Sequence, residues 1–261
     1  MNFFFSFSTK DYFCNLTIPK FKNYTLPNKK IRLYKIEILN NQWKLVDFNF
    51  IEDDNFFYVK SSSKKKTFNI FFLSSEKNII SKKKKLENEL IFIDNFTDTF
   101  PDFRSNLEIN NNFEGFSSYQ SEYPLQMVIK NGNVISNVSI LLNENARKNI
   151  LFFVNIHKQP VNKKFNMYML DLKKEEVLYK HTFLTNYVNE VEISTELIKN
   201  KNIYIYTENY LGIPIFLSEH SNQLSFEHSQ PMQEFLLQSE KFLDVKKIKN
   251  KFNEIIIKKS I

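Results

Sequence analysis

Cysteine, glycine and alanine are scarce in this chain, and the first two shortages narrow the chemistry that it can carry. The single cysteine, Cys14, excludes an intrachain disulfide and a zinc site built from several thiolates. Only three glycines occur in 261 residues, so a glycine-rich backbone cradle for phosphate groups is not expected. The sequence also contains no G-x-G-x-x-G, Walker, G-x-S-x-G or H-E-x-x-H motif, which removes the most recognisable catalytic signatures.

Long apolar runs are missing as well. No stretch approaches the roughly 18 consecutive apolar residues that a membrane-spanning helix needs. Residues 1–10 are apolar, but this run is too short for a signal sequence and lacks a basic start and a small-residue cleavage site. We therefore expect a soluble, cytoplasmic protein in which Cys14 is a buried small hydrophobic residue.

Arginine is rare beside lysine, although the chain carries a net charge of +7. The arginines are Arg32, Arg104 and Arg147. Dedicated recognition of phosphates and bases favours the planar guanidinium group, so the lysine excess is typical of a solvated surface. Phe, Ile, Lys, Asn and Tyr are also the residues that an AT-rich genome over-supplies. A lysine-mediated binder of nucleic acid or of a membrane surface is the third functional hypothesis.

Aromatic and β-branched residues are abundant, and they occur in short runs separated by polar turns. Hydrophobic residues make up 42% of the chain and aromatic residues 16%, enough for a packed core. Strands are predicted at residues 31–39, 43–50, 56–59, 67–73, 90–93, 126–130, 133–135, 139–142, 150–156, 165–170, 177–183, 188–193, 203–207, 214–218 and 224–228. This spacing predicts a mainly β protein with an antiparallel β-sandwich or jelly roll, preceded by a smaller β-rich unit.

The predicted boundaries divide the chain into three parts. We expect a β-rich domain over 1–110, a β-sandwich domain over 111–235, and a helix packed on the sandwich over 236–261. The helix follows from apolar residues at spacings of three and four between Phe242 and Ile256. Ser229 and Pro231 suit a cap and a first turn, which would start the helix near Gln230.

Two hairpins are predicted from asparagine-containing turns. Asn40-Asn41 would reverse the chain between strands 31–39 and 43–50, because asparagine tolerates the left-handed conformation. Asn131-Gly132 would form a type I′ turn between strands 126–130 and 133–135. The segment from 113 to 124 is predicted to be a polar and aromatic loop.

That loop is the first candidate binding site. Aromatic faces and hydrogen-bonding groups together suit a polar ligand such as a carbohydrate. Arg104, upstream, could hold a carboxylate or phosphate with two parallel hydrogen bonds. The candidate ligand-binding residues are Arg104, Tyr119, Gln120, Glu122 and Tyr123.

The second candidate site lies near the end of the predicted sandwich. His228 and Glu234 are candidates for acid-base catalysis, and His220, His228 and Glu234 are candidate ligands of a divalent metal. Alternation along strand 224–228 places His228 on the face of Leu224 and Phe226, so a buried core histidine is the competing interpretation.

Three functions remain open from the sequence. The leading hypothesis is an accessory or binding module that recognises a polar ligand or a partner protein. The alternative is a jelly-roll enzyme with a His/Glu site, and the third is the lysine-mediated binder. Sandwich folds carry all three, so the fold alone does not choose between them.

Overall fold

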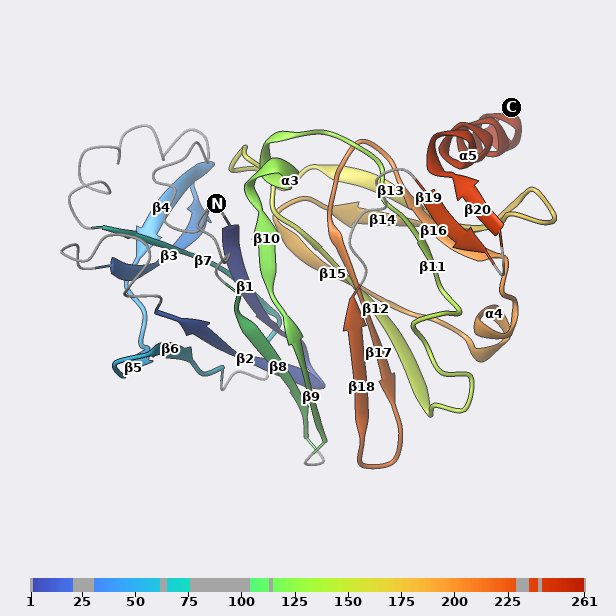
Figure 1. Cartoon of the computed structure of the whole chain (residues 1–261). Helices are drawn as coiled ribbons and strands as arrows, with labels where there is room; N and C mark the ends of the chain where they lie inside the picture. The colour runs from blue at the N-terminus through green and yellow to red at the C-terminus, as the bar shows by residue number, and fades with distance from the viewer. Residues whose placement is uncertain are drawn as a thin grey trace. The chain divides into compact units, whose positions relative to one another are not determined.

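The computed structural model describes residues 2–20, 31–61, 65–75, 104–112, 115–228, 235–238 and 241–260, and it is mainly β (Figure 1). Contacts between Cα atoms divide the chain into two compact units. The N-terminal unit contains Met1–Ile129, Ile156–Val161 and Asn222–Leu224, and the C-terminal unit contains the remaining residues. Each unit has its own sheet system, which confirms the predicted mainly β class.

The N-terminal unit is built on one curled, antiparallel, ten-stranded sheet. Its strands are β1 (Asn2–Ser8), β2 (Tyr12–Pro19), β3 (Ile31–Leu39), β4 (Gln42–Val46), β5 (Ile51–Glu52), β6 (Phe56–Val59), β7 (Thr67–Ser75), β8 (Asn106–Asn111), β9 (Phe116–Gln120) and β10 (Glu122–Pro124). The main order is β4-β3-β7-β1-β2-β6-β5, while β10 pairs with β1 and β9 pairs with β8. β1 and β2 were not among the predicted strands, although the phenylalanines of β1 are all buried and every second residue of β2 is buried.

The β3–β4 hairpin confirms the predicted turn. Asn40 and Asn41 have φ angles of 54° and 57°, so both adopt the left-handed conformation of a two-residue hairpin. Leu39 pairs with Gln42 and Lys35 with Val46. β4 ends at Val46 and not near Phe50, and the chain then leaves β3.

The C-terminal unit is a β-sandwich of two four-stranded antiparallel sheets. The first sheet contains, in order, β11 (Ile135–Asn137), β16 (Ile203–Thr207), β13 (Lys164–Asp171) and β14 (Glu176–Leu184). The second contains β15 (Tyr187–Glu192), β12 (Lys148–Asn155), β17 (Ile213–Glu219) and β18 (Leu224–His228). Leu151, Phe153 and Phe216 of the second sheet share one buried cluster with Met167 and Met169 of the first. This cluster is the core of the sandwich.

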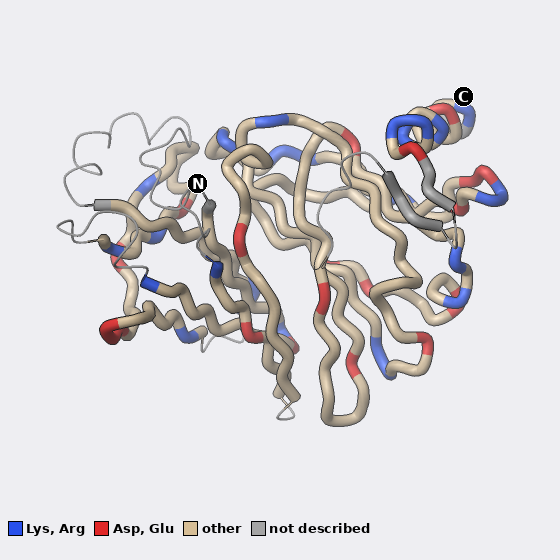
Figure 2. The backbone as a smooth tube through the Cα atoms, in the orientation of Figure 1, with Lys and Arg blue, Asp and Glu red and all other residues tan. Residues whose placement is uncertain are grey.

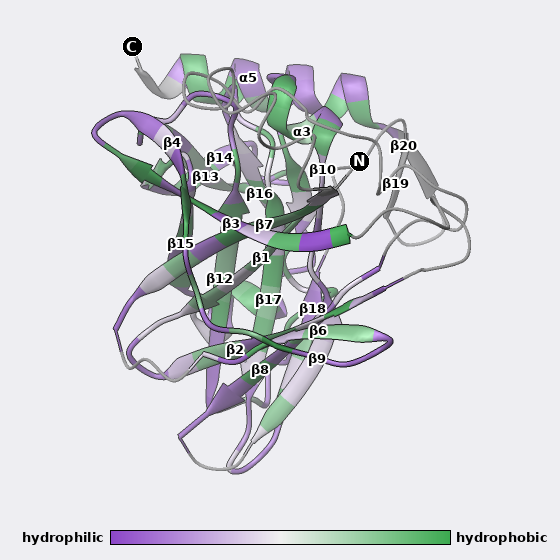
Figure 3. Cartoon of the chain, turned by 90° about the vertical axis from the view of Figure 1, so that its left-hand side faces the viewer, coloured by the Kyte–Doolittle hydropathy of each residue, from purple (hydrophilic) through white to green (hydrophobic). Residues whose placement is uncertain are grey.

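The C-terminal helix α5 (Val245–Ser260) packs on the first sheet of the sandwich. Phe252, which is fully buried, contacts the rings of Tyr204 and Tyr206 at centroid distances of 5.9 and 5.5 Å. Hydrophobic and hydrophilic residues both occur along the helix in Figure 3, and its buried residues follow spacings of three and four, as the predicted amphipathic pattern requires.

The start of α5 differs from the prediction. Strands β19 (Phe235–Gln238) and β20 (Lys241–Asp244) precede the helix, so Phe242 belongs to a strand. Asp244 caps the helix, because its Oδ1 atom accepts hydrogen bonds from the backbone N–H groups of Lys246 and Lys247 at 2.9 and 3.3 Å. The cap and first-turn residues that were predicted near Gln230 lie outside the described residues.

Two predicted elements around Asn131 are wrong. Residues Leu125–Ile129 form the short helix α3, and neither Asn131 nor Gly132 has a positive φ angle, so there is no type I′ turn. Tertiary packing overrides the strand propensity here, because Met127 and Val128 are buried. Gly132 instead allows close packing, since a Cβ atom there would lie 2.8 Å from Leu211 Cδ2.

Two further segments differ from the prediction. Residues 139–142 form a turn, because Asn137 Oδ1 accepts hydrogen bonds from the N–H groups of Ser139 and Ile140 at 2.9 and 3.2 Å. The predicted loop at 113–124 contains strands β9 and β10. The predicted strand at 90–93 lies outside the described residues.

The structure does not test the predicted domain boundaries, because those boundaries state which segments of the chain fold independently.

Among the described residues, the helices include a further short one, α4 (Thr195–Lys199), and none is long and apolar enough to cross a membrane.

Candidate ligand-binding pocket at the edge of strand β3

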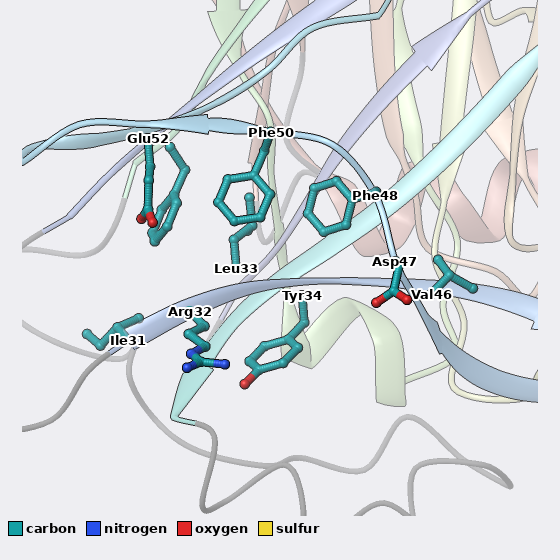
Figure 4. Close-up of a pocket in the computed structure, with 10 residues that line it drawn as sticks. Ile31, Arg32, Leu33, Tyr34, Val46, Asp47, Phe48, Phe50 and Glu52 are labelled. Carbon is teal, nitrogen blue, oxygen red and sulfur yellow. The ribbon is translucent and has the colours of Figure 1, made fainter.

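A pocket of about 350 Å³ lies in the N-terminal unit, beside the beginning of β3 (Figure 4). We name it the β3 pocket. It is lined by Ile31, Arg32, Leu33, Tyr34, Val46, Asp47, Phe48, Phe50, Glu52 and Phe57. These residues come from β3, from the end of β4, from the segment that joins β4 to β5, and from β5 and β6.

The pocket exists because the chain leaves β3 after Val46. Phe48 and Phe50 then anchor the connecting segment over the curled sheet, and their ring centroids lie 5.2 Å apart. Phe48 packs against Phe71 at 5.3 Å and Phe50 against Phe57 at 5.8 Å. Phe50 is still 37% exposed, so part of its ring can meet a ligand.

The two sides of β3 give the pocket two different surfaces. In Figure 4 the side chain of Leu33 points toward the phenylalanine rings, whereas Arg32 and Tyr34 point to the opposite side of the strand. Tyr34 stacks on the buried ring of Phe72 at 5.6 Å. The pocket therefore has an apolar side and a polar side.

Charged side chains of both signs stand at the pocket. Arg32, Asp47 and Glu52 are exposed. The Glu52 carboxylate forms an ion pair of 2.5 Å with the Lys20 ammonium group, which also lies 4.2 Å from the ring centroid of Phe57. A cation over an aromatic face is favourable, so Lys20 fixes this corner of the site.

The turn after β5 holds that corner in place. Asp53 Oδ1 accepts hydrogen bonds from the N–H groups of Asn55 and Phe56 at 2.6 and 2.7 Å, and the Tyr58 hydroxyl donates to Asp53 Oδ2 at 2.8 Å. The backbone hydrogen bond from Asn55, together with the other two, lowers the pKa of the Asp53 carboxyl. The β5–β6 turn is therefore ordered beside the pocket.

The five predicted ligand-binding residues lie elsewhere in the N-terminal unit. Arg104 donates a hydrogen bond from Nη1 to Gln120 Oε1 at 3.1 Å, so these two are brought together, with Tyr119 half-buried on the same strand as Gln120. Glu122 and Tyr123 are buried.

Glu122 and Tyr123 hold the backbone in place. The Glu122 carboxylate accepts a hydrogen bond of 2.6 Å from the Ser105 N–H group. Burial raises the pKa of the Tyr123 hydroxyl, which bonds the backbone of Ile156. The role of all five residues in ligand binding stays a prediction.

The predicted His/Glu residues do not converge in the described part of the chain. His220 follows β17 directly and His228 ends β18, so the two histidines stand at opposite ends of this hairpin. Phe226 is buried, Glu227 is exposed and His228 is half-buried, as the predicted alternation requires. Glu234 lies outside the described residues, so the catalytic and metal roles stay predictions.

Within the described ranges, no group of three His, Cys, Asp or Glu side chains is arranged to hold a metal ion. Burial raises the pKa of the Cys14 thiol, which keeps it protonated and unreactive.

Acidic residues are interspersed with the lysines and arginines along the described chain (Figure 2). Those of α5 are partly engaged, since Lys251 pairs with Glu175 at 2.7 Å and Lys249 donates to the Asn133 carbonyl at 2.8 Å. The apolar face of α5 is buried against the sandwich. The lysine-rich segments at 61–66 and 81–85 lie mostly outside the described residues.

No sequence pattern predicted the β3 pocket, although some signals of it are present. Arg32 is one of three arginines and lies in a predicted strand, and Phe48 and Phe50 fall within the next predicted strand, at 43–50. The decisive feature is the end of β4 at Val46, which no local pattern marks. Comparisons with protein-family models, curated proteins and solved structures found no match.

Proposed function

We propose that this protein is a ligand-binding module and that the β3 pocket is its ligand site. The observation that carries this proposal is the pocket itself. Its volume of about 350 Å³ falls within the range of roughly 300–1,000 Å³ that is usual for ligand sites. Its lining residues are mostly aliphatic or aromatic, and three are charged, which is the usual composition of such sites.

The ligand should combine an apolar part with hydrogen-bonding groups. Phe48 and Phe50 offer ring surface, and Arg32, Asp47 and Glu52 offer charged hydrogen-bonding partners. A carbohydrate or a segment of a partner protein would present both kinds of group. The proposed function is the same as the leading hypothesis from the sequence, but the residues proposed to bind the ligand are those of the β3 pocket.

The test is a binding screen with the purified full-length chain. Mono- and disaccharides and short blocked peptides are scored by thermal shift, and each hit is measured by calorimetric titration. Phe50→Ala removes an exposed ring from the pocket and should weaken binding about tenfold, which is the expected effect of one well-placed aromatic contact.

A matched control is available in the same unit. Phe116 lies on β9 and is 66% exposed, and it does not line the pocket. Phe116→Ala should leave the affinity unchanged. Equal affinities of the parent and Phe50→Ala, or no hit in any class, would contradict the proposal.

A further inference from the structure

In the part of the chain that the structure describes, no strand pairs with one edge of the first half of β3, and this edge lies in the pocket. β7 pairs with β3 over Ile31–Ile36, whereas β4 pairs with it only over Lys35–Leu39. Among the described residues, no strand covers the β4 side of β3 at Ile31 and Leu33. A sheet edge of this kind is a template for another strand.

The register shows which backbone groups face the pocket. In a two-residue hairpin the residues flanking the turn form a hydrogen-bonded pair, here Leu39 with Gln42. The pattern repeats every second residue in an antiparallel ladder. Ile31 and Leu33 therefore direct their N–H and C=O groups to the same side as Leu39, which is the side of the pocket.

The other wall of the pocket belongs to the opposite end of the sheet. β4 and β5 are the two ends of the main strand order, and Glu52 of β5 and Phe57 of β6 line the same pocket as Ile31–Tyr34. Within the described chain, β5 pairs with β6 alone. The curled sheet is thus open between β3 and β5, and the opening is the β3 pocket.

We infer that the β3 pocket receives an extended peptide segment of a partner protein, which adds a strand to the edge of β3 at Ile31 and Leu33. This inference rests on the proposed function and names the class of its ligand. Backbone hydrogen bonds supply affinity in this mode of recognition, and alternate side chains supply specificity. A carbohydrate would use the rings and charges but not the strand edge.

The two surfaces of the pocket predict the sequence pattern of the peptide. Successive side chains of an added strand point to opposite faces. One set would meet Leu33 and the phenylalanine rings, and the other would meet Arg32, Tyr34 and Asp47. The bound peptide should therefore alternate apolar residues with polar or charged ones.

The experiment uses acetylated and amidated synthetic peptides in which Phe, Val or Ile alternates with Asp, Lys or Thr. Each is paired with a peptide of identical composition whose apolar residues are contiguous. Calorimetric titration of the full chain should show alternating peptides binding at least about tenfold more tightly, the equivalent of losing one or two contacts in the scrambled form.

Backbone recognition is tested separately on the tightest peptide. Two variants of this peptide are compared, one N-methylated at the odd positions and one at the even positions. The variant whose blocked N–H groups face β3 should bind about tenfold more weakly, and the other variant should bind nearly as well as the parent peptide. In the protein, Ile31→Pro removes one edge N–H group at the first residue of β3, where proline is tolerated. This substitution should weaken peptide binding and leave the fluorescence emission of Trp43 unchanged.

Each outcome decides the inference. Peptide binding that ignores both the alternation and the phase of N-methylation would overturn strand addition. A saccharide that binds in the pocket while no peptide does would overturn it and leave the proposed function standing. If neither class binds, both are wrong.

Discussion

The surroundings of His181 shift its pKa. It lies half-buried on β14, and its ring stacks near that of Tyr179 at a centroid distance of 6.4 Å. Desolvation by burial lowers its pKa in the folded protein, because the charged imidazolium loses water contacts. The unfolded chain therefore binds a proton at a higher pH than the folded chain does.

The sign of the pH effect follows. The stability contributed by neutral His181 is fully present above its unfolded pKa of about 6.5, and is lost as the pH falls through the folded pKa. We expect urea unfolding of the parent to show lower stability at acidic than at neutral pH, and His181→Gln to reduce that difference. An identical pH dependence in the variant would contradict this account.

At the scale of elements, the β3–β4 turn offers a direct test of hairpin chemistry. Asn40 and Asn41 both have positive φ angles. Asn41→Gly should stabilise the fold by about 0.5–1 kcal/mol, because glycine adopts this conformation without a Cβ penalty. Asn41→Val should destabilise it by about 1–2 kcal/mol.

The readout is the emission of Trp43, the single tryptophan, which is buried on β4 and reports on this unit. Gly132→Val, which lies in the C-terminal unit and is measured by circular dichroism during urea unfolding, serves as a contrast, since Gly132 has no positive φ angle. Its cost should come from contact with Leu211, so additional Leu211→Ala should recover part of the loss. Equal stabilities of the Gly and Val variants at position 41 would disprove the turn assignment.

Helix α5 provides a matched pair for the packing of the C-terminal unit. Ile255 is 4% exposed and lies in the cluster with the first sheet of the sandwich, whereas Ile257 is 60% exposed. Ile255→Ala should cost about 2–5 kcal/mol through lost burial and a cavity. Ile257→Ala should change the unfolding free energy by no more than about 0.5 kcal/mol. Similar losses from both in denaturant unfolding would show that the helix does not dock as described.

At the scale of the whole molecule, the sequence predicts the class of the fold better than it predicts the individual strands. A strand was predicted at residues 150–156, and the corresponding strand β12 lies between β15 and β17. Strands β8, β9 and β10 were missed because their residues are polar or lie beside turn-forming residues, and distant partners stabilise them. Residues 122–124, for example, pair with residues 2–4 at the other end of the unit.

The candidate site was less predictable than the fold for the same reason. His228 and Arg104 were chosen as candidate site residues because their side chains are chemically distinctive, yet neither residue lines the β3 pocket. The pocket is made by ordinary phenylalanine, leucine and arginine residues that a strand ending brings together. Sequence patterns report the period of each element, but they do not report where two ends of a curled sheet meet.

The predicted domain boundary near residue 110 can be tested with the fragment 1–110. This fragment would lack β9 and β10, which pair with β8 and β1. It would also lack the carbonyl of Lys158, to which the indole N–H group of Trp43 donates a hydrogen bond of 2.9 Å.

Loss of two strands and of a buried hydrogen-bond partner should prevent cooperative folding of this fragment, because strand edges and an indole donor would be uncovered. We expect a red-shifted Trp43 emission and poorly dispersed amide resonances from the fragment, and the opposite from the full chain. A cooperative urea transition of the fragment, with Trp43 emission like that of the full chain, would instead support residue 110 as a true boundary. It would then follow that β9, β10 and residues 156–161 decorate this unit without being needed for its fold.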